Sequence, residues 1–270
     1  MDDRTPPLGV LLRTWRGRRR LSQMELAHRA GVSPRHLSFV ETGRARPSRE
    51  MVLHLAEHLD VPLRERNGLL LAAGFAPAYR ESDLDDPSLA AVRAGLERIL
   101  AAHEPYPAVI VDRRWNLVSA NAAAQMFLEG VDPALLGPPL NVLRLTFHPE
   151  GMGGRIANLD EWADHTLGRL KREATITGDA DLLALEAELR DLVAAQGVAR
   201  SPAPEGPTPP AVTLRLRTDE GELAFVATIA TFGTALDVTL AELAIETFLP
   251  ADAATAALLA ARAERAPAPA

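Results

Sequence analysis

Apolar residues in the first 75 positions recur every three to four residues, in short runs that begin at recognisable cap residues. Ser22 is followed three residues later by Glu25, which is the capping-box pattern. Ser33 precedes Pro34 at the first helical position, and Ser48 opens another run. This pattern predicts five short helices. The tight turn before Ser33 predicts that the second and third helices form a helix-turn-helix unit.

The pattern changes in the second part of the chain, where short apolar runs alternate with longer helical ones. Two short strands around a polar turn are expected at 108–111 and 117–120, and three more strand signals follow residue 211. Helical patterns are predicted at 88–104, 121–129, 158–173 and 179–196. This order predicts an α+β domain built on an antiparallel sheet, a different fold class from the helical N-terminal part.

These patterns divide the chain into four parts. The expected parts are a helical DNA-binding domain at 1–76, a linker at 77–87, an antiparallel-sheet domain at 88–252, and an Ala-rich helix with a disordered tail at 253–270. The sheet domain contains a stretch at 197–211 with five prolines, which predicts a mobile loop.

Charge is distributed unevenly over the 270 residues, whose formal net charge is −7. Residues 1–80 carry 14 Arg against 8 acidic residues, while the remainder carries 15 basic and 28 acidic residues. Such asymmetry favours contact of the N-terminal part with a polyanion.

Composition restricts the possible chemistry and location. The absence of cysteine excludes disulfides, thiolate metal sites and cysteine nucleophiles. No apolar run is long enough to predict a membrane span, and the start of the sequence has no signal-peptide pattern. We therefore expect a cytoplasmic protein without a membrane partner.

The segment LSQMELAHRAGVSPRHLSFVETGRARPS, residues 21–48, resembles the XRE-type (lambda-repressor-like) helix-turn-helix domain. The resemblance implies that the helix after Ser33 enters the major groove of a double-stranded DNA operator and reads bases with its first residues. The expected DNA-binding residues are Gln23, Ser33, Pro34, Arg35, His36, Phe39, Arg44 and Arg46.

These residues have different expected roles. Arg35 can contact guanine, and Phe39 can contact a thymine methyl or belong to the core. His36 can contact a base, contact a phosphate or remain solvated. By family position Gln23 and Ser33 meet phosphates, whereas Arg44 and Arg46 attract the backbone. The family also implies an ion pair between Arg16 and Glu41. A nearby metalloprotease-like pattern, HLAEH at 54–58, is read as solvated surface because no third ligand is evident.

Residues 88–252 resemble the ligand-binding domain of MmyB-like transcription regulators, which has a PAS-like fold. The resemblance rests on ILAAHEPYPAVIVDRRWNLVSAN (99–121), NVLRLTFHPEGMGGRIANLDEWADHTLGRLKRE (141–173) and GELAFVATIATFGTALDVTLAELAIETFLPAD (221–252). It implies a small apolar cavity and a lipid-like ligand, such as a fatty acid. No other cofactor is expected.

Candidate ligand-binding residues are of two kinds. The aromatic candidates are Trp115, Phe127, Phe147, Trp162, Phe225 and Phe232, and the cations that could hold an acidic ligand are Arg144, His148, Arg155 and His165. The alternative is that all of them are ordinary core or surface residues, since apolar stripes usually form core.

The hypothesis that follows is a homodimeric, sequence-specific transcription regulator that senses a small apolar or fatty-acid-like ligand. The alternative is a helix-turn-helix regulator whose C-terminal domain is a non-sensing dimerisation or protein-partner module. No catalytic constellation is evident, so an enzyme is not expected.

Overall fold

The computed structural model describes residues 6–197 and 211–265, which form two compact units. The chain first passes from one unit to the other between Ser82 and Asp83. Most of the loop expected at 197–211 and the tail at 266–270 lie outside the described residues.

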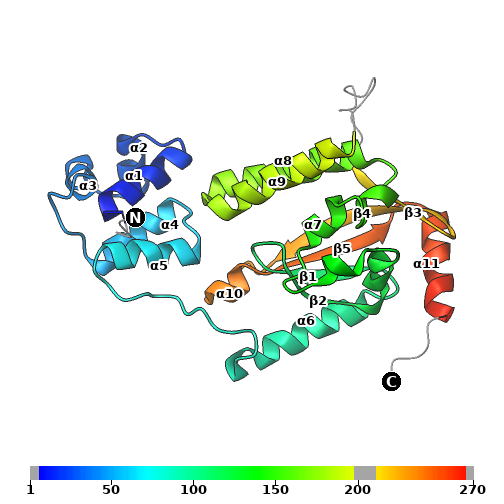
Figure 1. Ribbon diagram of the computed structural model, residues 1–270. Helices are drawn as coiled ribbons and strands as arrows, with labels where there is room; N and C mark the ends of the chain where they lie inside the picture. The colour runs from blue at the N-terminus through cyan, green and yellow to red at the C-terminus, as the bar shows by residue number, and fades with distance from the viewer. Residues whose placement is uncertain (1–5, 198–210, 266–270) are drawn as a thin grey trace. The chain divides into compact units, whose positions relative to one another are not determined.

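The N-terminal unit contains the five short helices that the cap signals predicted (Figure 1). They are α1 (Leu8–Arg18), α2 (Gln23–Arg29), α3 (Pro34–Glu41), α4 (Arg49–His58) and α5 (Leu63–Ala72). The side chains of Ser22, Ser33 and Ser48 each accept a hydrogen bond from the backbone N–H three residues later, and Glu25 completes the capping box. Each cap satisfies an amide that would otherwise lack a partner at a helix start.

The core of this unit fixes the position of α3. Leu12 and Trp15 of α1 pack in the same buried cluster as Leu37 and Val40 of α3. At Gly9 the two helices are so close that a Cβ atom would lie 2.3 Å from the carbonyl oxygen of Glu41. Only glycine permits this approach, so α1 and α3 pack backbone against backbone at that point.

The second unit is built on a five-stranded antiparallel sheet. Its strands are β1 (Ala108–Val111), β2 (Leu117–Ala120), β3 (Thr213–Thr218), β4 (Gly221–Thr231) and β5 (Ala244–Pro250), in the order β2-β1-β5-β4-β3. Every neighbouring pair runs antiparallel. The central strand β5 comes last in the chain and lies between β1 and β4. The expected α+β domain with an antiparallel sheet is confirmed.

The rest of the chain contains helices of two types, of which residues 173–179 and 234–241 group with the first unit and the remainder with the second. The α-helices are α6 (Ala90–Ala102), α7 (Val142–Phe147), α8 (Leu159–Thr177), α9 (Ala180–Ala195), α10 (Val238–Ala241) and α11 (Ala253–Arg265). The 3-10 helices are η1 (Pro87–Leu89), η2 (Ala122–Leu128), η3 (Pro133–Leu136) and η4 (Gly153–Arg155). Only Gly178 and Asp179 separate α8 from α9 in the chain. The segment 121–129 forms a 3-10 helix, and α7 is an element that the periodicity did not predict.

The Ala-rich helix α11 belongs to the sheet domain. It packs against β4 and β5, and the buried hydroxyl of Thr255 accepts a hydrogen bond of 2.9 Å from the backbone N–H of Ala224. The sheet domain therefore extends beyond residue 252, where the apolar pattern of the strands ends.

Alternation along β5 separates the two faces of the sheet. Glu246 and Phe248 point to one face, where the rings of Phe127 and Phe225 lie edge-on to that of Phe248. Thr247 and Leu249 point to the other face, where Leu249 is exposed. The first face is the one on which the helices enclose the core.

Candidate functional site

Helix α3, which the sequence predicts to be the recognition helix, exposes several of the predicted DNA-binding residues. Ser33 caps its start by accepting a hydrogen bond of 3.1 Å from the N–H of His36, and Pro34 occupies the first turn. The side chains of Pro34 and Arg35 are exposed, and those of His36 and Phe39 are partly exposed. The guanidinium of Arg35 lies 5.4 Å from the centre of the Phe39 ring. Arg35 and Phe39 thus form one outward-facing pair on successive turns of the helix, as a groove-reading surface requires.

Two more expected contacts follow α3 in the chain. Arg44 and Arg46 are exposed in the loop between α3 and α4. The side-chain amide of Gln23 donates a hydrogen bond of 3.0 Å to a carboxylate oxygen of Glu41. This bond uses one of the two N–H donors of the amide, and the other is left for a contact outside the protein.

The expected Arg16–Glu41 ion pair is confirmed. Nε and Nη2 of Arg16 donate to the two carboxylate oxygens of Glu41 at 2.8 and 3.0 Å, and this bidentate geometry raises the pKa of Arg16. The Glu41 side chain is 1% exposed, so its carboxylate lies inside the domain. Arg13 adds a hydrogen bond of 2.9 Å to the Glu41 carbonyl. Glu41 thus joins α1, α2 and α3.

The two histidines of the HLAEH pattern make local contacts. Nε2 of His54 lies 2.7 Å from the carbonyl oxygen of Ala30, and Nδ1 of His58 lies 3.0 Å from the carbonyl oxygen of His54. Among residues 6–197 and 211–265 no group of three His, Asp or Glu side chains is placed to hold a metal ion.

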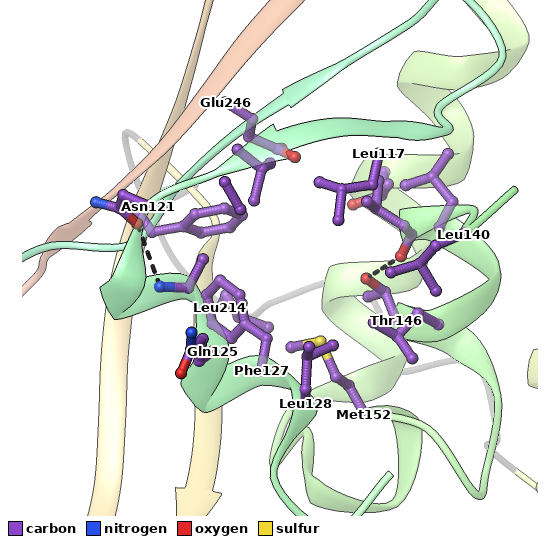
Figure 2. Close-up of a pocket in the computed structure, with 18 of the residues that line it drawn as sticks. Leu117, Asn121, Gln125, Phe127, Leu128, Leu140, Thr146, Met152, Leu214 and Glu246 are labelled. Atoms are coloured by element: carbon purple, nitrogen blue, oxygen red, sulfur yellow. Dashed lines mark hydrogen bonds between the residues drawn. The ribbon is translucent and has the colours of Figure 1, made fainter. Parts of the chain in front are cut away.

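The sheet domain contains a cavity of about 170 Å³ against the inner face of the sheet (Figure 2). One wall is formed by the strands, including Val109, Leu214 and Phe248. The opposite walls come from η2, α7 and α8, and the lining is mainly Leu, Val, Ala, Met and Phe side chains. Asn121 also lines the cavity, but its amide is used locally: Oδ1 accepts from the N–H groups of Ala108 and Ala124. An apolar cavity with few polar groups is the usual form of a small-molecule site.

Of the six aromatic candidates, Phe127 and Trp162 line this cavity. Trp115, Phe147 and Phe225 are buried elsewhere in the core, and Phe232 is partly exposed after the end of β4. The guanidinium carbon of Arg169 lies 4.4 Å from the centre of the Trp115 ring, in a cation–π contact.

None of the four candidate cations lines the cavity. Arg144 forms an exposed bidentate pair with Glu188, and Nδ1 of His148 accepts a hydrogen bond from the N–H of Glu150. Arg155 donates to the Phe127 carbonyl at 2.7 Å, while burial lowers its pKa. Burial, with Arg169 and Arg172 nearby, also lowers the pKa of His165, so this side chain favours the neutral form.

The charged residue at the cavity is an acid, Glu246, which sequence reasoning did not single out. It is 7% exposed and lies on β5 opposite Val109 of β1. Desolvation raises its pKa to about 7, and the positive charge of Arg169 offsets this only partly. The sequence does contain a sign of this residue: Glu246 is the single acid in the apolar strand AIETFLP. It lies two positions before Phe248, so the alternation of a strand places both side chains on the same face.

Family comparisons agree with both halves of this description. The model described as MmyB-like transcription regulator ligand binding domain matches residues 92–261, which is more than half of the chain. The chain belongs to the MmyB-like transcription regulator family. A helix-turn-helix domain model matches residues 7–69 of this MmyB-like regulator. The chain is thus a helix-turn-helix transcription regulator with a ligand-binding domain, and the match to residue 261 includes most of α11.

Other comparisons add little. No curated protein matches the chain. Among solved structures, "Structure of an RNA-binding Light-Oxygen-Voltage Receptor" matches with 14% identity and a TM-score of 0.28, over 96% of this chain and 63% of that chain. The chain thus spans less than two thirds of that receptor, and a TM-score of this size supports no argument. Within the described part of this MmyB-like regulator, no helix has both the length and the apolar character of a membrane span.

Proposed function

We propose that this regulator binds a specific operator as a homodimer and that a small apolar ligand in its sheet-domain cavity changes its affinity for DNA. The observation that carries the proposal is the apolar cavity of about 170 Å³ in a family-assigned ligand-binding domain. In a dimer of this kind the two recognition helices must meet half-sites about 34 Å apart, so a small change in their spacing alters affinity. A non-sensing dimerisation module would not need an open apolar cavity.

The surface of α3 supports the DNA-binding part of the proposal. Arg35 is exposed next to Phe39, whereas Arg44 and Arg46 lie in the following loop. Arg35 is therefore proposed to read a base, and Arg44 and Arg46 to contact phosphates. Gln23 and Ser33 are proposed to meet phosphates through their side chains and through N–H groups at the helix starts. The Gln23 amide keeps a second N–H beside the one given to Glu41, and the Ser33 hydroxyl, which accepts from His36, can still donate its own proton.

The DNA-binding part of the proposal is tested in two steps. The full chain first selects its binding sites from random DNA, and it is then titrated with the selected operator and with a scrambled sequence. Arg35→Ala should lose about 1–3 kcal/mol on the operator and relax one base position, whereas Arg46→Ala should weaken both DNAs alike. Arg98→Ala, which removes an exposed arginine of α6, is the matched control. Equal losses on both DNAs for Arg35→Ala and Arg46→Ala would contradict the assigned roles.

The sensing part is tested by filling the cavity. Ala124 is buried in its wall, so Ala124→Leu should block occupancy, whereas Ala101→Leu places the same added volume on the exposed side of α6. Native mass spectrometry of protein expressed in its own host should detect a small molecule on the wild type and on Ala101→Leu but not on Ala124→Leu. Operator affinity should differ between the occupied and the blocked proteins. Unchanged affinity would instead favour the non-sensing dimerisation or partner module.

A further inference from the structure

Glu246 is a buried acid whose carboxyl has no hydrogen-bond partner among the described residues. Within residues 6–197 and 211–265 its carboxyl makes no hydrogen bond and no ion pair, although it lies on the central strand of the sheet. Figure 2 shows this carboxyl pointing into the space enclosed by the apolar cavity residues. Buried carboxyl groups in proteins are normally hydrogen-bonded or paired, because an unpaired one is costly to desolvate.

The immediate surroundings of Glu246 offer no substitute for that partner. Its neighbours across the strands are Val109 and Ile229, and Phe248 follows on the same face. Arg169, the nearby cation, stacks over the Trp115 ring and acts on Glu246 through its charge. The carboxyl is therefore oriented toward the cavity, the place from which a missing partner can come.

Two polar side chains of α8 share the cavity with Glu246. Trp162 and Thr166 are four residues apart and both line it, so they lie on one face of the helix. The indole Nε1–H of Trp162 is buried and has no acceptor among the described residues. Thr166 is 3% exposed and offers a hydroxyl that can donate or accept. The lining therefore contains one acid, Glu246, and the Thr166 hydroxyl, together with the polar side chains of Asn121, Gln125 and Thr146; the other lining residues are apolar or aromatic.

We propose that the cavity accepts a short amphiphile whose polar end is a hydrogen-bond donor, an alcohol or an amine, bound to the Glu246 carboxyl. This inference rests on the proposed ligand-binding function and specifies its ligand class. A cavity of about 150 Å³ holds one benzene molecule, so 170 Å³ suits roughly six to ten non-hydrogen atoms.

A carboxylate ligand fits this cavity poorly. Among the described residues the lining contains no Arg, Lys or His, and a ligand carboxylate near Glu246 would place two acids together. Like charges in one buried site disfavour ionisation of both. The fatty-acid-like ligand that the family resemblance implies therefore lacks the buried cation it requires.

A series with one six-carbon chain and different ends tests the proposal. Hexan-1-ol, hexylamine and sodium hexanoate are titrated into the full chain at about pH 8, where both Glu246 and hexanoate are ionised. Binding is measured by calorimetry and by ligand-observed NMR. The alcohol and the amine should each bind at least about tenfold more tightly than hexanoate, because a hydrogen bond to a charged group supplies that difference.

Two variants relate the preference to one side chain. Glu246→Gln keeps the shape but removes the charge, so it should weaken hexylamine at least about tenfold and reduce the discrimination against hexanoate. Glu246→Leu removes the hydrogen-bond acceptor and should abolish the preference for the alcohol. Glu222→Gln, which changes an exposed glutamate paired with Arg215, is the control and should bind all three compounds like the wild type.

The outcomes separate this inference from the proposed function. Hexanoate binding as tightly as hexan-1-ol, or an unchanged ranking in Glu246→Gln, would overturn the inference. A fatty acid retained by protein from its own host would also overturn it, while leaving ligand sensing intact. Failure of all three compounds to bind, together with no co-purifying molecule, would overturn both.

Discussion

Replacing Glu246 by Gln should remove an unusual dependence of stability on pH. The folded protein raises the pKa of this carboxyl from the ordinary 4.5 to about 7 by burying it against apolar side chains. Because the folded pKa exceeds the unfolded one, the contribution of Glu246 to stability is fully present below about pH 4.5. It is lost as the pH rises to about 7 and stays lost above that value. The amide in the Glu246→Gln variant has no titrating proton in this range, so the variant should show no such decline.

The size of the effect follows from the gap between the two pKa values. The interval from 4.5 to about 7 corresponds to about 3 kcal/mol, at about 1.4 kcal/mol for each pH unit. The difference in unfolding free energy between Glu246→Gln and the wild type should therefore increase by about 3 kcal/mol between about pH 4 and about pH 8. For a domain of this size the same change is about 6–12 °C in melting temperature.

The measurement is urea unfolding of both proteins across this pH range, followed by tryptophan fluorescence. A Trp15→Phe background removes the tryptophan of the N-terminal domain and leaves Trp115 and Trp162, which are both buried in the sheet domain. Comparing differences between the two proteins cancels the other titrating groups and any constant change in packing. Parallel stability curves from about pH 4 to about pH 8 would refute the reasoning, because they would mean that Glu246 ionises normally in the folded state.

Three further changes have defined outcomes. Glu41→Ala leaves Arg16 without its partner and should destabilise the N-terminal domain by about 3–5 kcal/mol, as measured by thermal denaturation. The double variant Arg16→Met with Glu41→Leu should lose less stability, because it leaves no unpaired buried charge. A larger loss of stability in the double variant would contradict this. Ser48→Ala removes the α4 cap and should cost about 1 kcal/mol, with Ser48→Asp close to wild type in the same assay; equal melting temperatures for all three proteins would count against the cap. Arg144 lowers the pKa of Glu188 by hydrogen bonding, so the exposed pair should add less than about 1 kcal/mol to the free energy of unfolding above about pH 4.5, and this contribution should disappear as the pH falls. The unfolding free energies of Glu188→Gln and the wild type should therefore converge in acid. A difference that widens in acid would contradict this pH dependence.

The N-terminal domain was predictable in detail because its signals are local. A helix cap needs only a serine and the backbone three residues on, and Ser22, Ser33 and Ser48 all behave in this way. The Arg16–Glu41 pair joins distant residues, and family resemblance supplied it. The engagement of Gln23 with the same carboxylate was not predicted, because it depends on how α2 packs next to α3.

The cavity was less predictable because its lining comes from segments far apart in the chain. Aromatic residue type alone did not separate Trp162, which lines the cavity, from Phe147, which is ordinary core. The acid at the cavity became visible only through sheet register, which places Glu246 opposite Val109 in the middle of the sheet. Strand parity gives the face on which a residue lies, but not whether that face meets a packed helix or an opening.

The contacts that hold α3 in place and the residues that face outward from it are different sets. Leu37, Val40 and Glu41 are buried and fix the helix, whereas Arg35 and Phe39 remain accessible on its other side. Replacing the outward residues therefore need not disturb the ion pair or the core. With the operator-reading role proposed for α3, a lineage of such proteins could acquire a new operator by exchanging a few surface side chains. The same separation would make α3 a suitable graft for redirecting the regulator to a chosen DNA sequence.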